Sequence, residues 1–105
     1  MQAYIGERLV GVVLCRDEIK KGRLRGYVAM LVVDKAFRKH GIGSRLAAAA
    51  VSAMAANCHE VVLEAEESNT AAIRLYERLG FIRDKRLPKY YMNGSDAYRL
   101  VCYFT

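Results

Sequence analysis

Apolar and polar positions along the chain follow two periods, one typical of strands and one typical of helices. Runs rich in β-branched residues predict strands, and the first two runs lie close enough together for a hairpin. The charged residues 17–25 that follow are expected to form a loop. The predicted strands are residues 2–5, 8–16, 26–33, 61–65, 81–87 and 96–104, and the predicted helices are residues 42–56 and 70–79.

The two predicted helices carry signals at their ends. Residues 42–56 contain four consecutive alanines, which have the highest helix propensity, and Asn57 is expected to end this helix in a left-handed conformation. The pair Ser68-Asn69 offers an N-cap for the second helix, and Gly80 is expected to end it. The order β-β-β-α-β-α-β-β predicts one α/β (α+β) domain with a mixed sheet over the whole chain.

Length and composition limit the class of protein. At 105 residues the chain has room for one domain, and its 53% apolar and 27% charged residues exclude a disordered chain. No apolar stretch is long enough to span a membrane, and Glu7 interrupts any secretory signal. Cys15, Cys58 and Cys102 are too few for a disulfide scaffold, so we expect reduced thiols and a cytoplasmic protein. The net charge of +6 suits an anionic partner.

The turn between a predicted strand and the first predicted helix carries the clearest chemical signal. Gly41 and Gly43 flank a single residue at the helix start, where unpaired amides form an anion site. Arg38 and Lys39 add positive charge beside those amides. Taken alone, a Gly-x-Gly segment favours a simpler interpretation, a tight turn with a basic rim.

Two segments together favour a ligand site, because both resemble the GNAT family of acetyltransferases. The pattern Arg38-x-x-Gly41-x-Gly43 is similar to the pyrophosphate-binding signature of that family. The segment from Asn69 to Phe81 is similar to its Asn-x-x-Ala-x-x-Leu-Tyr-x-x-x-Gly-Phe pattern. The resemblance implies the GNAT acyl-CoA N-acyltransferase fold and acetyl-coenzyme A as the cofactor.

Further segments narrow the resemblance within the family. Residues 25–27 (Arg-Gly-Tyr) and 90–94 (Tyr-Tyr-Met-Asn-Gly) resemble the catalytic subunits of NatC-type N-terminal acetyltransferases. This implies transfer of acetyl to the α-amine of protein N-termini in which Met precedes a bulky apolar residue. The family domain normally opens with a strand and two helices that form one wall of the peptide channel, and we expect this chain to be truncated there.

The resemblance also implies how the coenzyme is bound. The strand at residues 26–33 is expected to diverge from the next strand, with pantetheine filling the gap and strand amides stabilising the thioester oxyanion. Asn69 and Tyr76, seven residues apart on one helix face, are expected to point along the coenzyme. The residues predicted to bind coenzyme are Leu31, Val32, Val33, Arg38, Lys39, His40, Gly41, Ile42, Gly43, Ser44, Asn69 and Tyr76.

Two side chains are implied as catalytic. Glu64 is expected to orient the amine and to accept its proton through water. The alternative is a glutamate exposed on the surface beside Glu66 and Glu67, which is the more common situation for a carboxylate. Tyr76 is expected to protonate or bind the departing thiolate, although a tyrosine at helical spacing is more often part of a core.

The resemblance places aromatic residues around the acceptor. Tyr27, Tyr90 and Tyr91 are expected to bind the peptide N-terminus, while packing of the last two over their own loop is an equally good interpretation. Neither His40 nor His59 has the neighbours of a metal ligand, so no metal is predicted.

Partners and alternative functions follow from the same residues. The expected partners are protein N-termini, auxiliary subunits, the ribosome and, for the isolated chain, a second copy, with no membrane and no sequence-specific nucleic acid. One alternative is a GNAT enzyme that acetylates lysine or a small amine. Another is a non-catalytic module that binds coenzyme or dimerises. A nucleic-acid module is disfavoured because Arg38 and Lys39 already have a phosphate partner.

Overall fold

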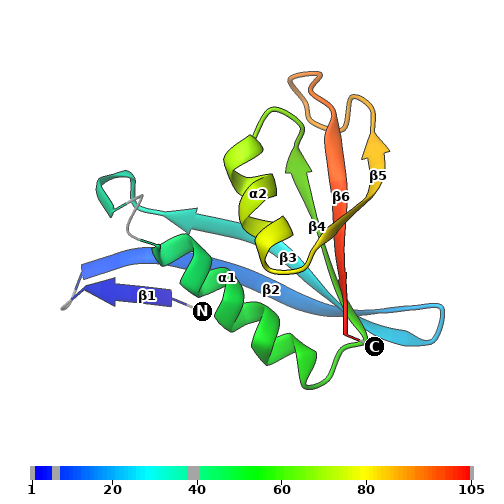
Figure 1. Cartoon of the computed structure of the whole chain (residues 1–105), viewed down its shortest axis with the longest axis horizontal. Coiled ribbons are helices and arrows are strands. Elements are labelled where there is room, and N and C mark those ends of the chain that lie inside the picture. Colours follow the sequence, from blue (N-terminus) through cyan, green and yellow to red (C-terminus); the bar gives the residue numbers. More distant parts are fainter. Residues whose placement is uncertain (1, 6–7, 38–40, 105) are drawn as a thin grey trace.

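The computed structural model describes residues 2–5, 8–37 and 41–104. In this part of the chain a six-stranded sheet carries two helices on one side (Figure 1). The predicted order of strands and helices is confirmed. The strands are β1 (Gln2–Ile5), β2 (Arg8–Lys20), β3 (Arg23–Val33), β4 (Glu60–Glu66), β5 (Ile82–Leu87) and β6 (Ala97–Tyr103), and the helices are α1 (Ile42–Ala55), α2 (Thr70–Arg78) and a short 3₁₀ turn at Lys35–Phe37.

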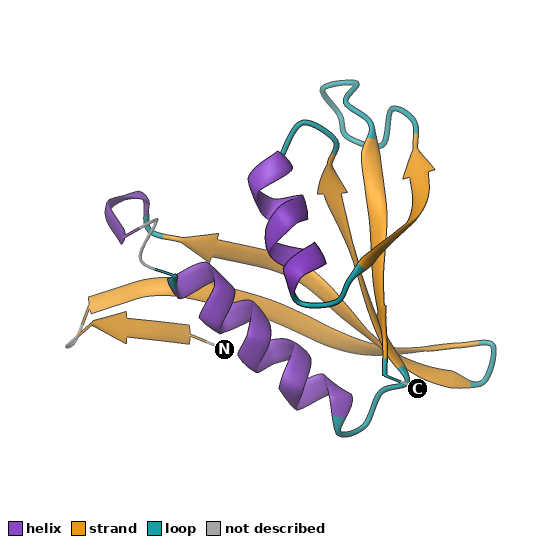
Figure 2. Cartoon of the chain, viewed as in Figure 1, coloured by secondary structure: helices purple, strands orange, loops and turns teal. Residues whose placement is uncertain are grey.

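The sheet divides into two halves that share a narrow junction. Its strand order is β1-β2-β3-β4-β6-β5, and β3 and β4 are the parallel pair. Their described ladder has three residue pairs and ends where Tyr27 lies opposite Val62. Beyond that point the two strands diverge, with α1 over β2 and α2 between the diverging ends of β3 and β4 (Figures 1 and 2).

Gly26 lies at this junction and allows α1 to approach it closely. A Cβ atom at Gly26 would lie 2.5 Å from Sδ of Met54 and 3.2 Å from Cγ2 of Val61. Non-bonded heavy atoms do not come as close as 2.5 Å, so a side chain here would displace Met54 or the strand. The absence of a side chain therefore helps to fix where the sheet narrows.

The prediction of a loop at residues 17–25 is wrong. β2 continues to Lys20 and β3 begins at Arg23, which leaves a two-residue turn of Lys21 and Gly22. Both turn residues have positive φ, 53° and 77°, as the tight turns that match strand twist require. Charged residues are compatible with this hairpin because they pair across it: Arg25 lies opposite Glu18, with Nη2 2.5 Å from its carboxylate.

The helix ends follow the predicted signals except at one position. The side chain of Asn69 caps α2, with Oδ1 accepting from the Ala72 amide at 3.2 Å, and Gly80 follows this helix with φ 103°. Asn57 is not left-handed. Instead, α1 ends at Ala55, and the amides of Asn57 and Cys58 both donate to the Met54 carbonyl, at 3.1 and 2.8 Å. This ending needs no positive φ.

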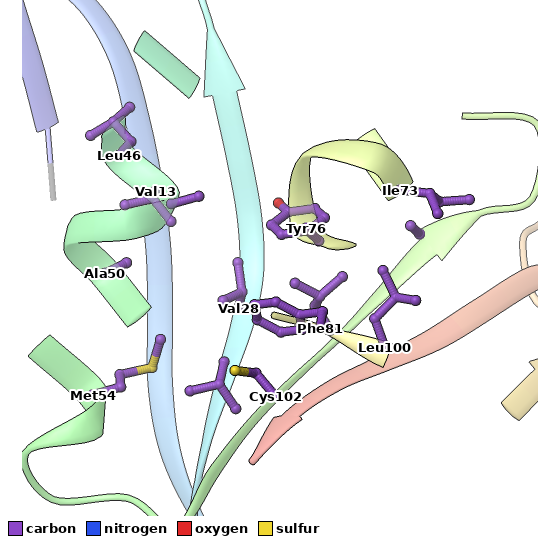
Figure 3. Packing of buried hydrophobic residues seen from close by; sticks show 14 of the residues in the cluster. Val13, Val28, Leu46, Ala50, Met54, Ile73, Tyr76, Phe81, Leu100 and Cys102 are labelled. Atoms are coloured by element: carbon purple, nitrogen blue, oxygen red, sulfur yellow. The ribbon is translucent and has the colours of Figure 1, made fainter. Parts of the chain in front are cut away.

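The helices and the sheet share one hydrophobic core (Figure 3). Leu46, Ala50 and Met54 of α1 pack against the β2–β3 half, and Ile73 and Tyr76 of α2 pack against the other half. The three cysteines, all within the described residues, are free. Neither described helix is long and apolar enough to cross a membrane. The core therefore holds both halves of the sheet in place on either side of the junction.

Candidate active site

The divergence of β3 and β4 opens a cleft of about 330 Å³. Its walls come from both strands, from α2 and from the loop before β6. The lining residues are Val28, Ala29, Met30, Leu31, Leu63, Glu64, Ala65, Glu66, Asn69, Ala72, Tyr76 and Tyr91. The sequence prediction that a gap opens at this pair of strands agrees with this geometry.

The β3 wall presents strand backbone to the cleft. One edge of β3 is paired with β2, while its described pairing with β4 stops at Tyr27. The β2–β3 register shifts by one residue between Leu14 and Cys15, which leaves Ala29 as an extra residue in β3. Of the three strand residues predicted to bind coenzyme, Leu31 lines the cleft. Val28, Ala29 and Met30, which precede it in the strand, line the cleft as well.

The start of α1 has the features of an anion site. Gly41 is the N-cap in a left-handed conformation with φ 75°, and no side chain of the described residues caps the helix. The first turn contains no acidic residue that would compete for its amides. A Cβ at Gly43 would be 3.6 Å from Val33 and 3.8 Å from Leu75, so this turn lies between the end of β3 and α2.

Several predicted coenzyme ligands fall in or beside this turn. Ile42 and Ser44 lie in the first turn of α1. Arg38, Lys39 and His40 lie outside the described residues.

On α2, Asn69 and Tyr76 both line the cleft, as their spacing predicts. Oδ1 of Asn69 is engaged by the Ala72 amide, so this side chain both caps the helix and borders the cleft. Tyr76 is only 7% exposed and packs edge to face on Phe81, with ring centroids 5.5 Å apart. Burial raises the pKa of the Tyr76 phenol to about 12, with a smaller contribution from Cys15. The phenol is therefore protonated at neutral pH and remains a proton donor.

Glu64 is not a surface carboxylate, because its side chain is only 5% exposed. Oε1 accepts hydrogen bonds from the hydroxyls of Tyr27 and of Tyr90, the latter at 3.0 Å. Nε of Arg99 lies 3.4 Å from Oε2. A buried carboxylate is stable only with such donors and a cation. Three separate segments thus converge on one glutamate at the cleft.

The two phenols are held in their neutral, donating form. Burial, followed by the hydrogen bond to Glu64, raises the pKa of Tyr27 far above its ordinary value. The hydrogen bond to Glu64 is the main reason that the pKa of Tyr90 is also raised. Arg16 additionally stacks over the Tyr27 ring, 4.6 Å from its centroid. Tyr27 and Tyr90 therefore contact the predicted catalytic carboxylate itself, a contact that the sequence did not reveal.

The loop that carries Tyr90 and Tyr91 is fixed at its base. The Tyr91 ring lines the cleft and meets the Tyr90 ring edge to face at 5.2 Å. The Asp96 carboxylate accepts from the Lys89 amide at 2.9 Å and from Arg86 at 2.7 and 3.0 Å. These bonds, that of the Lys89 amide first, hold the pKa of Asp96 below its ordinary value. The loop is therefore positioned over the cleft.

Arg99 is the site residue that sequence reasoning missed. It stands in the predicted last strand, directly opposite Glu64 in the β4–β6 register. An arginine in a mostly apolar strand is a signal that could have been noticed, but its partner depends on a register that the sequence does not specify. Among the described residues, no group of three or more His, Cys, Asp or Glu side chains is placed to hold a metal ion.

Comparison with known proteins agrees with this geometry. The model of the acetyltransferase (GNAT) family matches residues 1–81. N-alpha-acetyltransferase 30 of Homo sapiens is 53% identical over 100 residues, which are 93% of this chain and 28% of that protein. The Schizosaccharomyces pombe protein of the same name is 46% identical over 103 residues, 96% of this chain and 69% of that protein. The chain thus spans less than a third of the human relative.

Solved structures give the same result. The crystal structure of the NatC complex bound to Gag peptide and CoA contains a chain that superposes with a TM-score of 0.92 and 39% sequence identity, covering 98% of this chain and 66% of that one. Arabidopsis thaliana NAA60 in complex with acetyl-CoA superposes with a TM-score of 0.83 and 27% identity, covering 92% and 67%. The predicted fold is confirmed, and the chain belongs to the acetyltransferase (GNAT) family.

Proposed function

We propose that this chain binds acetyl-coenzyme A and transfers its acetyl group to the α-amine of protein N-termini that begin with Met and a bulky apolar residue. The observation that carries the proposal is the cleft, which is lined by both a buried carboxylate, Glu64, and a protonated phenol, Tyr76. Relatives named N-alpha-acetyltransferase 30 support the acceptor class.

The coenzyme is proposed to enter along β3. Its pantetheine would bond to strand amides between β3 and β4 as an added strand does, and Asn69 would border it. Its pyrophosphate would bind the amides of residues 38–44 at the start of α1, where the dipole and the basic residues favour an anion. The NatC and NAA60 structures named above contain CoA and acetyl-CoA, which supports this ligand.

The reaction is proposed to be a direct attack. The neutral α-amine attacks the thioester carbonyl carbon, a C–N bond forms, and backbone amides stabilise the oxyanion. Glu64 accepts the amine proton through water, the C–S bond breaks, and Tyr76 supplies a proton to the departing thiolate. The products are the acetylated N-terminus and coenzyme A. Tyr27, Tyr90 and Tyr91 border the position of the amine.

The experiment that tests this function is coenzyme A release in the presence of a peptide panel that varies at the first two residues. We expect peptides that begin Met-Leu to be acetylated faster than those that begin Ser-Glu. The control is a Met-Leu peptide with a blocked α-amine and one free lysine. Acetylation of that control at the rate of the unblocked peptide would contradict the proposal and favour a lysine acetyltransferase.

The partners of the chain are part of the proposal. Apolar side chains at Leu14, Met30 and Val32 are 49%, 41% and 46% exposed, and the first two lie opposite each other across β2 and β3. Exposed groups of this kind favour association. We therefore expect the isolated chain to form homodimers. We also propose that it binds auxiliary subunits, because a chain of the NatC complex superposes on it, and that it acts in the cytoplasm near the ribosome. Light scattering of the isolated chain checks the first point, and a monomer would contradict it.

A further inference from the structure

We propose that Arg99 is a positioning residue for the Glu64 carboxylate, holding its Oε2 atom at the cleft for the incoming amine. The inference rests on the proposed function, in which Glu64 takes the amine proton. Arg99 lies on β6 and is outside the set of residues that line the cleft. It would act through Glu64, its partner on β4.

The two oxygens of Glu64 have different surroundings. Oε1 accepts from two phenols, Tyr27 and Tyr90, which fill its two acceptor positions. Oε2 accepts a hydrogen bond from Nε of Arg99 at 3.4 Å, and with this one donor among the described residues it retains acceptor capacity. The amine, or the water that relays its proton, therefore binds at Oε2.

The fold brings Arg99 to this oxygen without any loop. Arg99 and Glu64 are direct partners in the antiparallel β4–β6 ladder, a position where Cβ atoms lie about 5 Å apart. The arginine side chain is 25% exposed and the glutamate side chain 5% exposed, so the pair is largely removed from solvent. A site built on paired strands is held more precisely than one on a loop.

Charge gives a second reason for the arginine. A glutamate side chain that is 5% exposed needs a cation, and among the described residues Arg99 supplies it. A guanidinium stays charged throughout the working pH range and has a fixed planar shape. It therefore neutralises Glu64 and limits rotation of the carboxylate away from the cleft.

The experiment combines kinetics with a double-mutant cycle. Arg99→Met is expected to lower kcat by about 10- to 100-fold, the loss that a small misplacement of a reacting group produces. The KM for acetyl-coenzyme A should stay unchanged. Arg99→Lys keeps the charge without the planar fork and should recover part of kcat. In a Glu64→Gln background, Arg99→Met should have no further effect.

A matched control comes from the neighbouring strand. Arg83 on β5 also forms an ion pair, with Nε 3.4 Å from the Glu77 carboxylate, and stacks on Tyr98, whereas the described side chains that bond to Glu64 are Tyr27, Tyr90 and Arg99. Arg83→Met should leave kcat unchanged. Thermal unfolding of every variant checks folding. If Arg99→Met is unfolded, the kcat of Arg99→Lys is compared with that of the wild type instead, in both the wild-type and the Glu64→Gln backgrounds.

The outcomes separate this inference from the proposed function. If Arg99→Met lowers kcat equally in the wild-type and Glu64→Gln backgrounds, Arg99 does not act through Glu64 and the inference is overturned. An unchanged kcat in Arg99→Met overturns it as well. A wild-type kcat in Glu64→Gln contradicts the role of Glu64 in the proposed function instead.

Discussion

The two ends of the candidate site are built in different ways. The proposed anion site at the start of α1 is local in sequence: Gly41 adopts φ 75° and the helix amides follow it directly. The carboxylate site is assembled from residues far apart in the chain, since Tyr27, Tyr90 and Arg99 lie 37, 26 and 35 positions from Glu64. The first depends on backbone geometry, and the second on strand register and on a loop fixed by Asp96.

The largest expected effect is at the backbone end. Gly43→Asp should abolish acetyl-coenzyme A binding, because a side chain obstructs the approach of the pyrophosphate and its charge repels it. The fold itself should persist, since a Cβ at Gly43 would meet its neighbours at 3.6 Å, an ordinary contact. Calorimetry measures the affinity. Ser52→Asp adds the same charge to an exposed position of the same helix and is the control.

The next effect is at the carboxylate and the phenol. Glu64→Gln and Tyr76→Phe should each lower kcat by about 10²- to 10⁴-fold, the usual loss of a positioned acid or base. Affinity for acetyl-coenzyme A should change little, because neither substitution removes a backbone contact. Steady-state kinetics measures kcat, and calorimetry measures the affinity for acetyl-coenzyme A. A large loss of coenzyme affinity in Glu64→Gln would mean that the two ends of the site are not separate.

The phenol of Tyr76 also predicts a dependence of stability on pH. Its pKa rises from 10.0 in the unfolded chain to about 12 in the fold. The contribution of the neutral phenol to the free energy of unfolding is therefore complete below pH 10 and is lost as pH rises toward 12. At about 1.4 kcal/mol per pKa unit, the loss is about 3 kcal/mol. Urea unfolding at pH 8 and pH 11.5 should therefore show a smaller alkaline loss for Tyr76→Phe than for the wild type.

The smallest effect is expected at the two phenols that share Oε1. Tyr27→Phe or Tyr90→Phe should each lower kcat by about tenfold, because one donor remains and a hydrogen bond to a charged group is worth about 1.5–3 kcal/mol. The double variant should lose more than the product of the two single losses. No loss in one single variant, with equal losses in the other and in the double variant, would show that only one phenol supports the carboxylate.

This contrast also explains what the sequence could predict. Features encoded by neighbouring residues were predictable: the Asn69 cap, the end of α2 just before Gly80, and the order of strands and helices. Features that depend on pairing between distant segments were not. The extension of β2 and β3 across residues 17–25 depends on charge pairs between the strands and on turn residues with positive φ. A run of charged residues in the sequence does not show which of them will pair.

The site followed the same division. Family resemblance indicated Glu64 and Tyr76, and both line the cleft. Tyr27 and Tyr90 were predicted to contact the peptide, yet their hydroxyls donate to Glu64. Arg99 was not predicted at all, because its role follows from standing opposite Glu64 in the β4–β6 register. A residue type can be recognised in a sequence, but a contact between two strands requires the register.

The missing side chain at Gly26 acts on the site from outside it. The residue borders Met54 of α1 and Val61 of β4, and the next residue in the chain is Tyr27, whose hydroxyl reaches Glu64. An added methyl group would have to displace the Met54 side chain or move β3 at the vertex of the opening. A movement of β3 there would change the angle at which the two strands diverge, so a position outside the cleft lining can influence the width of the cleft.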